Sequence, residues 1–272
     1  MKRYLCLLLV LVLLLLPMGC KKDAAQTAAN GTQPMIFNAE DYTSTGTCGD
    51  NVQWGINAAT GELGIGGEGA MYDYSLDLEP APWADYNYTS VRVCDGVTAI
   101  GIEAFRGCES LVSAEISGTV TSIGAGAFYS CTNLTNVNIP ASVTDIGQNA
   151  FAVCSGLSEI SVSGDNGSFQ SIDGVLFTKD GKTLLQYPVG KGLDSYRIPD
   201  GVETIEELAF AFCGDTLSSI HIPSSVTSIG KSAFIGCRVL ETVNYAGTEG
   251  QWKAIKIADE NDLLLMADIQ FS

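Results

Sequence analysis

The sequence contains one histidine, His221, and only 14 lysine and arginine residues against 31 aspartate and glutamate residues in a chain of 272. A single histidine makes histidine-based acid–base catalysis and histidine metal sites poor candidates. The formal net charge of −17 disfavours nucleic acid and anionic lipid as partners, because phosphate binding needs clustered lysine and arginine. Basic proteins and cations are compatible with this charge, and solubility alone also accounts for it.

Long apolar runs are missing after the N-terminus. The one such run extends from Leu5 to Leu16, follows two basic residues, and is too short to cross a bilayer as a mature helix. It leads into the letters LPMGC, which resemble a bacterial lipobox, although Pro17 stands where leucine is usual. We therefore expect a signal peptide over residues 1–19 and lipidation of Cys20. An ordinary signal peptide with a free Cys20 is the alternative.

A lipid anchor would place the protein in the bacterial cell envelope as an outer membrane lipoprotein, attached to the membrane only through its acyl chains. Residues 20–45 are largely polar and alanine-rich, which predicts a flexible tether. Charged residues directly after the lipidated cysteine direct export to the outer face in some bacteria, so we expect surface exposure. Which leaflet carries the anchor stays open.

One motif occurs five times between Val97 and Tyr245. The copies read VTAIGIEAFRGCESL, VTSIGAGAFYSCTNL, VTDIGQNAFAVCSGL, VETIEELAFAFCGDTL and VTSIGKSAFIGCRVL, beginning at Val97, Val120, Val143, Val202 and Val226. The first three copies begin 23 residues apart and the last two 24. This period is typical of leucine-rich repeats, in which each unit is one solenoid turn that buries its apolar side against its neighbours. We predict a leucine-rich repeat solenoid, mainly β, with short helical or irregular turns.

Each repeat continues into the pattern L-x-x-V-x-I, as in Leu134, Val137 and Ile139, which is typical of a strand with one face in a core. The motif phenylalanines occupy equivalent positions and should stack as one buried aromatic column: Phe105, Phe128, Phe151, Phe210 and Phe234. The outward strand positions form two polar ladders: Ser113, Asn136, Glu159, Ser219 and Thr242, and Glu115, Asn138, Ser161, His221 and Asn244.

The pattern VTsIGxxAFxxCxxLxxVxIP resembles the BspA-like (Bacteroides surface protein A-like) leucine-rich repeat family, and the resemblance covers nearly everything after residue 45. It implies three parts in order: an N-terminal β-hairpin cap over 46–96, repeats over 97–246, and a C-terminal cap over 247–272. It also implies an inserted β-hairpin within 163–200, with its turn at Asp180 and Gly181. Adhesion to host or neighbouring-cell proteins is the function that the resemblance implies.

The chain has nine cysteines, of which five occur once per repeat: Cys108, Cys131, Cys154, Cys213 and Cys237. These five do not have the spacing of metal ligands, and in-register side chains on adjacent turns point the same way rather than at each other. We therefore predict buried free thiols in the repeats and no metal site. A disulfide between Cys48 and Cys94, in or next to the first cap, stays open.

Motifs that resemble enzyme sites have simpler explanations in this sequence. Gly64, Gly66 and Gly69 match G-x-G-x-x-G, but no phosphate-binding helix follows them, so we predict a glycine-rich turn. His221 takes a solvent-facing strand position, where a surface residue is expected rather than a general base. We predict a protein without enzymatic activity, catalytic residues or cofactor.

Function should therefore come from a surface. By analogy with other leucine-rich proteins, we expect a protein ligand on the outward strand positions, chiefly Asn136, Asn138, Glu159, Ser161, Ser219, His221, Thr242 and Asn244. The alternative is a carbohydrate-binding accessory lipoprotein that stacks sugars on an aromatic cluster: Tyr72, Tyr74, Trp83, Tyr86 and Tyr88. The same cluster would instead be the core of the cap if it covers the edge of the first repeat. We expect a monomer, and the identity of the ligand stays open.

Overall fold

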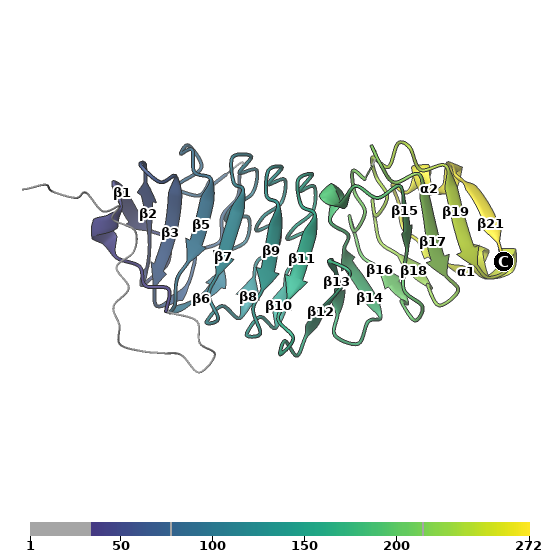
Figure 1. Ribbon diagram of the computed structural model, residues 1–272, viewed down its shortest axis with the longest axis horizontal. Coiled ribbons are helices and arrows are strands. Elements are labelled where there is room, and N and C mark those ends of the chain that lie inside the picture. The colour runs from purple at the N-terminus through teal and green to yellow at the C-terminus, as the bar shows by residue number, and fades with distance from the viewer. Residues whose placement is uncertain (1–33, 77, 214) are drawn as a thin grey trace, which may run out of the picture.

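The repeat folds as one turn of a β-solenoid, because its apolar strand residues pair with the equivalent residues one turn earlier. The computed structural model describes residues 34–76, 78–213 and 215–272. Figure 1 shows the turns following one another along the long axis of the molecule. This architecture confirms the predicted leucine-rich repeat solenoid.

The strands with the L-x-x-V-x-I pattern form two sheets, here called the front sheets. The first contains β1 (Ser44–Thr47), β2 (Val52–Asn57), β3 (Glu62–Gly67), β5 (Ser90–Val93), β7 (Ser113–Ile116), β9 (Asn136–Ile139) and β11 (Glu159–Val162). The second contains β15 (Ser195–Arg197), β17 (Ser219–Pro223), β19 (Thr242–Ala246) and β21 (Asp268–Phe271). From β3 onward the pairing is parallel, so the parallel ladder already begins within the segment predicted as the N-terminal cap.

Shorter strands form two back sheets on the other side of the core. One contains β4 (Gly69–Ala70), β6 (Val97–Ile100), β8 (Ser122–Ile123) and β10 (Asp145–Ile146). The other contains β12 (Phe169–Ile172), β13 (Val175–Thr178), β14 (Thr183–Gln186), β16 (Thr204–Ile205), β18 (Ser228–Ile229) and β20 (Lys256–Ile257).

Helices are few and short: η1 (Ala39–Asp41), η2 (Val189–Lys191), α1 (Glu249–Ala254) and α2 (Asp262–Met266). The helix α1 begins at a capping box made by Thr248 and Gln251, and its Trp252 packs against Tyr245 at 5.3 Å between ring centroids. β20 and β21 then continue the back and front sheets by parallel pairing with β18 and β19. Within the described ranges, no helix has the length and apolar character needed to span a bilayer.

A glycine follows the back-sheet isoleucine in most repeats, because successive turns approach closely there. A Cβ on Gly124 would lie 2.5 Å from the nitrogen of Ile102, and a Cβ on Gly147 would collide with the backbone of Ala125. Glycine is therefore required at these positions. The fourth repeat has Glu206 at the equivalent position, which indicates that its neighbour on that side is different.

The motif phenylalanines form two columns, so the prediction of one continuous column is wrong. The first column contains Trp83, Phe105, Phe128 and Phe151, and the second contains Tyr187, Phe210 and Phe234. Neighbouring ring centroids within a column are between 4.9 and 5.7 Å apart. The two columns belong to separate clusters of buried side chains.

The inserted hairpin separates the two cores. Its strands β13 and β14 are antiparallel, and Gly181 in their turn has φ +71°, as the predicted turn requires. On β13 the side chain of Leu176 lies in the first core, whereas those of Val175 and Phe177 lie in the second. Since side chains of a strand alternate between its faces, β13 is a wall with a core on each side. We call β12 to β14 the partition hairpin.

The repeat cysteines are free thiols, as predicted, and all but Cys108 are fully buried. The thiol donates to the carbonyl oxygen of a phenylalanine in the preceding turn, for example from Cys131 to Phe105 at 3.1 Å and from Cys154 to Phe128 at 3.0 Å. Cys48 is also a free thiol, so it forms no disulfide with Cys94. Burial raises the pKa of Cys48 to about 12, which keeps its thiol protonated.

The described chain starts with a segment that crosses the front face at its N-terminal end. Cβ atoms placed on Gly64 and Gly66 would collide with Tyr42 and Phe37, and the rings of these two aromatic residues stack 4.9 Å apart. Gly64 and Gly66 lie within β3, so the predicted glycine-rich turn is wrong: these glycines make room for aromatic rings. Residues 34–45, expected to be part of the tether, thus include a segment packed on the solenoid.

Candidate functional site

Four of the predicted residues lie together on the first front sheet. Asn136 and Asn138 on β9 lie in register with Glu159 and Ser161 on β11. Asn136, Asn138 and Glu159 are exposed, and the hydroxyl of Ser161 donates to Oδ1 of Asn138 at 3.2 Å. We call the outward side chains of β5 to β11 the N-terminal ladder.

The other four predicted residues lie on the second front sheet, where Ser219 and His221 on β17 are in register with Thr242 and Asn244 on β19. All four are half-buried, and Nδ2 of Asn244 donates to Oγ of Ser219 at 3.1 Å. We call the outward side chains of β15 to β21 the C-terminal ladder.

The one histidine belongs to this C-terminal ladder. Nη2 of Arg197 donates to Nδ1 of His221 at 3.3 Å. Partial burial, and then the charge of Arg197, lower the pKa of His221 below its ordinary value of 6.5. The imidazole is therefore mainly neutral at pH 7, and because Nδ1 accepts from Arg197, the neutral ring carries its proton on Nε2.

The structure does not place the eight predicted residues on one sheet. The first front sheet ends at β11 and the second begins at β15. Between them lies the partition hairpin. The backbone amide of Ile160 on β11 donates to the carbonyl oxygen of Gly174, in the turn between β12 and β13, at 2.9 Å. A partner that contacts both ladders must therefore cross this hairpin.

Two arginines on the ladders were not predicted from the sequence. Arg92 on β5 is in register with Glu115 and lies 3.2 Å from Glu62 and 3.5 Å from Glu115. Arg197 on β15 is in register with His221. Extending the repeat spacing backwards would have found both, because Arg92 precedes Glu115 by 23 residues and Arg197 precedes His221 by 24.

The aromatic cluster is divided, because Trp83, Tyr88 and the half-buried Tyr74 pack in the core, whereas the other two tyrosines are exposed. Trp83 and Tyr88 are buried, and Nε1 of Trp83 donates to the carbonyl oxygen of Ala104 at 2.9 Å. Trp83 is therefore unable to stack on a sugar. Tyr72 and Tyr86 are 48% and 40% exposed. Tyr86 borders a shallow groove of about 430 Å³ whose polar lining includes Asn87, Arg106, Glu109 and Asn133.

Metal chemistry finds no support in the arrangement of side chains. Over the residues that the structure describes, no group of three or more histidine, cysteine, aspartate or glutamate side chains could hold a metal ion. The acidic residues of the ladders are spread along the sheet, and Glu62 and Glu115 both contact Arg92.

Comparison with protein families gives a match to the BspA type leucine rich repeat region, in six copies over residues 81–188 and 189–253. No curated protein matches the chain.

Solved structures with similar chains include a leucine-rich repeat protein from Eubacterium ventriosum, at 25% identity over 75% of this chain and 72% of that chain, with a TM-score of 0.45. The pneumococcal vaccine antigen PcpA is similar at 17% identity over 75% and 73% of the two chains, with a TM-score of 0.48. A leucine rich cell surface protein from Faecalibacterium prausnitzii is similar at 22% identity over 80% and 99%, with a TM-score of 0.34.

Proposed function

Because this chain belongs to the BspA-type leucine-rich repeat family, we propose that it is a surface-anchored interaction protein without enzymatic activity, which adheres to proteins of the host or of neighbouring cells. The partner binds the outward side chains of the front sheets. The N-terminal ladder is the principal site, and the lipidated N-terminus holds the protein at the bacterial outer membrane.

The observation that carries this proposal is the contrast between inward and outward positions of the same strands. Inward residues such as Val137 and Ile160 are fully buried and change little from repeat to repeat. Outward residues at one equivalent position change from Ser113 to Asn136 to Glu159, which alters both size and charge. Information specific to a partner therefore sits on the outward side, because buried residues are unable to contact it.

The exposure of its middle strands favours the N-terminal ladder over the C-terminal one. Glu115 and Glu159 are exposed and Arg92 is half-buried beside Glu115, so the ladder offers charges of both signs to a partner. In the C-terminal ladder the outward side chains of the middle strands β17 and β19 are half-buried, and their polar groups largely contact each other or Arg197. Charges on an exposed rim mainly set the association rate and the specificity.

The test is binding of the chain without residues 1–19 to a panel of purified extracellular matrix proteins, measured by surface plasmon resonance. A variant with Asn136, Asn138, Glu159 and Ser161 all changed to alanine should lose most of the binding, with an unchanged circular dichroism spectrum. The matched control is Thr144→Ala with Asp145→Ala, which removes the same charge from exposed positions of the back sheet. Equal binding by the ladder variant and the parent would exclude the N-terminal ladder.

The anchoring part of the proposal rests on Cys20, which lies outside the described residues together with the signal peptide and most of the tether. Acyl chains contribute about 0.8 kcal/mol per buried methylene, and stable attachment needs more than one chain. Cys20→Ser should therefore move the protein from the membrane fraction to a soluble fraction. Membrane retention of this variant, with no lipid adduct in the mass spectrum of the natural protein, would contradict the anchor.

A carbohydrate ligand is the second candidate, and the exposed ring of Tyr86 at the edge of the groove with Asn87, Arg106 and Asn133 is the observation that favours it. Tyr86→Ala should abolish any signal on a glycan array. Tyr72→Ala is the matched control, because Tyr72 is similarly exposed but does not line the groove. A glycan signal that survives Tyr86→Ala would place the sugar elsewhere.

A further inference from the structure

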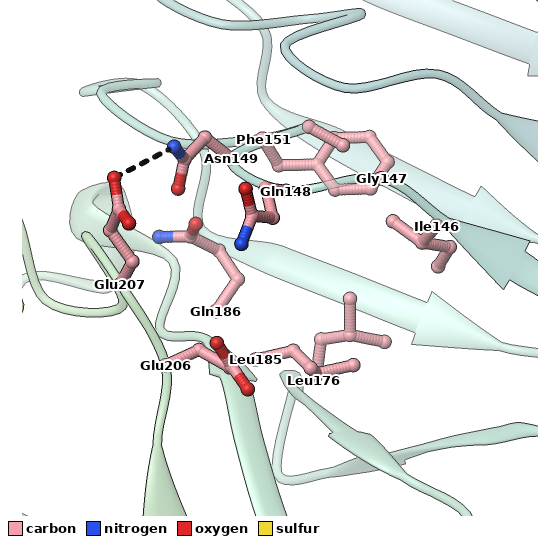
Figure 2. Close-up of a pocket in the computed structure, with 11 residues that line it drawn as sticks. Ile146, Gly147, Gln148, Asn149, Phe151, Leu176, Leu185, Gln186, Glu206 and Glu207 are labelled. Carbon is pink, nitrogen blue, oxygen red and sulfur yellow. Dashed lines mark hydrogen bonds between the residues drawn. The ribbon is translucent and has the colours of Figure 1, made fainter. Parts of the chain in front are cut away.

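A pocket of about 220 Å³ lies on the back side, where the partition hairpin meets the repeats on either side of it. Its lining comes from residues around β10, from β13 and β14 of the hairpin, and from the residues after β16. Figure 2 shows apolar side chains, including Ile146, Leu176 and Leu185, on one side and polar side chains on the other. We call it the seam pocket. It lies behind the ladders and is independent of them.

The pocket exists because the hairpin turn is shorter than a repeat turn. Leu184 is in register with Ile205, and Tyr187 stacks on Phe210 at 5.1 Å, so these pairs are structurally equivalent. Two residues separate Leu184 from Tyr187, whereas four separate Ile205 from Phe210. The missing two residues leave open the space that a full turn would fill.

Glu206 stands at the edge of this space. In the repeats on both sides the equivalent residue is glycine, because a Cβ on Gly147 or Gly230 would collide with the backbone of the preceding turn. The turn that precedes Glu206 in the stack is the short hairpin turn from Leu184 to Tyr187. A side chain therefore fits at Glu206, where it lines the pocket. The side chain that the sequence places there is a carboxylate, next to a second carboxylate at Glu207.

The polar side of the pocket has more hydrogen-bond acceptors than donors. Oδ1 of Asn149 is buried and has no hydrogen-bond partner, while its Nδ2 donates to Glu207 at 3.5 Å. The side-chain nitrogen Nε2 of Gln186 already donates to the carbonyl oxygens of Tyr187 and Ala209, at 3.1 and 3.2 Å. Only the side-chain oxygen of Gln186 is therefore left to contact a ligand.

The two carboxylates also lack a cationic partner. Within the described chain neither Glu206 nor Glu207 forms an ion pair within 4.0 Å; Lys231, near Glu207, instead pairs with Glu260 at 3.0 Å. A buried unpaired acceptor beside carboxylates without an ion pair suits a ligand that brings donors and positive charge.

We propose that the seam pocket binds an alkylammonium group, supplied by a free diamine or by a lysine side chain of a polypeptide. The methylene chain lies against Leu176 and Leu185, and the ammonium group donates to Glu206, Glu207 and Oδ1 of Asn149. An ammonium group has three donors and no acceptor, which matches this set. A calcium ion would need six to eight oxygen ligands, and the apolar wall is unable to supply them.

The experiment uses two probes: 1,5-diaminopentane, and a short peptide with an acetylated N-terminus, an amidated C-terminus and a single lysine whose side chain is free. Each probe is titrated into the chain without residues 1–19 by isothermal calorimetry at about 0.15 M salt. Saturable 1:1 binding is expected for at least one probe. Tighter binding of the diamine identifies a small-molecule site, and tighter binding of the peptide identifies a site for protein lysines. Absence of saturable binding by both probes overturns the proposal.

Paired variants separate the pocket from the general negative charge of the protein. Glu206→Gln with Glu207→Gln should weaken binding by about tenfold or more, since both charge-assisted hydrogen bonds are lost. The control Asp145→Asn with Asp200→Asn removes the same charge at exposed positions outside the pocket and should leave affinity within about twofold. Equal weakening by the two pairs, with melting temperatures like that of the parent, overturns the pocket as the site.

Discussion

The two halves of the solenoid use the same repeat but differ where they meet the partition hairpin. The N-terminal half, β2 to β11, stacks three motif phenylalanines behind Trp83, whereas the C-terminal half, β14 to β21, stacks two behind Tyr187. The ladders differ as well, because the outward side chains of β7 and β9 are exposed, whereas those of β17 and β19 are half-buried. The repeat thus determines each turn, whereas the hairpin determines how far one core and one ladder extend.

The division into two cores has a consequence for stability. The turns of a solenoid contact mainly their neighbours, so its stability is approximately a sum of terms for single turns and for adjacent pairs. A cavity made in one core should therefore lower the local stability of that core and leave the stability of the other nearly unchanged. Hydrogen exchange reports this behaviour strand by strand.

The largest effect is expected for Phe128→Ala in the middle of the first column. Phe128 stacks on Phe105 and on Phe151, and its removal leaves a cavity that should cost roughly 3 to 5 kcal/mol. Exchange should accelerate in β5 to β11 and stay slow in β16 to β19. Asn138→Ala, on the exposed side of the same sheet, is the control and should cost under about 0.5 kcal/mol. Acceleration spread equally over both halves would show that the molecule unfolds as one unit.

The partition itself is tested by two leucines of the hairpin with the same chemistry. Leu176 lies in the first core and Leu184 in the second, and both are buried. Each change to alanine should cost roughly 2 to 5 kcal/mol. Leu176→Ala should accelerate exchange in β9 and β11, and Leu184→Ala in β16 and β18. The same exchange pattern for both variants would mean that the hairpin does not divide the core.

The sequence predicted the repeating turns well, because the motif returns the same buried residues at a fixed spacing. It did not predict the break in the aromatic column, because Tyr187 continues the stack from a segment without the motif. A signal was present: Val175, Leu176 and Phe177 are consecutive apolar residues, which is typical of a strand buried on both faces.

The binding surfaces were predictable only in part. The outward register of residues such as Asn138 and Glu159 follows from alternation along the strand. The ladders lie on separate sheets because of the path that the hairpin takes. The repeat motif contains no information about this path. The seam pocket arises from two residues that a short turn lacks, and the glutamate at a glycine position was its one visible sign.

A smaller effect is expected from the contact between turns. Gly124→Ala places a Cβ 2.5 Å from the nitrogen of Ile102, and this overpacking should cost roughly 1 to 3 kcal/mol. Glu206→Ala occupies the equivalent position beside the seam pocket and should cost under about 0.5 kcal/mol. Urea denaturation of the two variants measures the difference. An equal cost would show that the turn before Glu206 packs as tightly as the others do.

The smallest effect concerns pH and is confined to the C-terminal ladder. Partial burial and Arg197 lower the pKa of His221 in the folded chain, so the unfolded chain binds the proton more readily. The stability that depends on His221 is therefore complete above about pH 6.5 and is lost as the pH falls through the lower folded-state pKa. Because the chain has one histidine, a single imidazole signal in an NMR titration gives this pKa directly. Arg197→Gln should move the pKa of His221 back toward 6.5, whereas Arg92→Gln on the other ladder should leave this pKa unchanged. A pKa at or above 6.5 in the unaltered protein would show that the contact between Arg197 and His221 does not persist in solution.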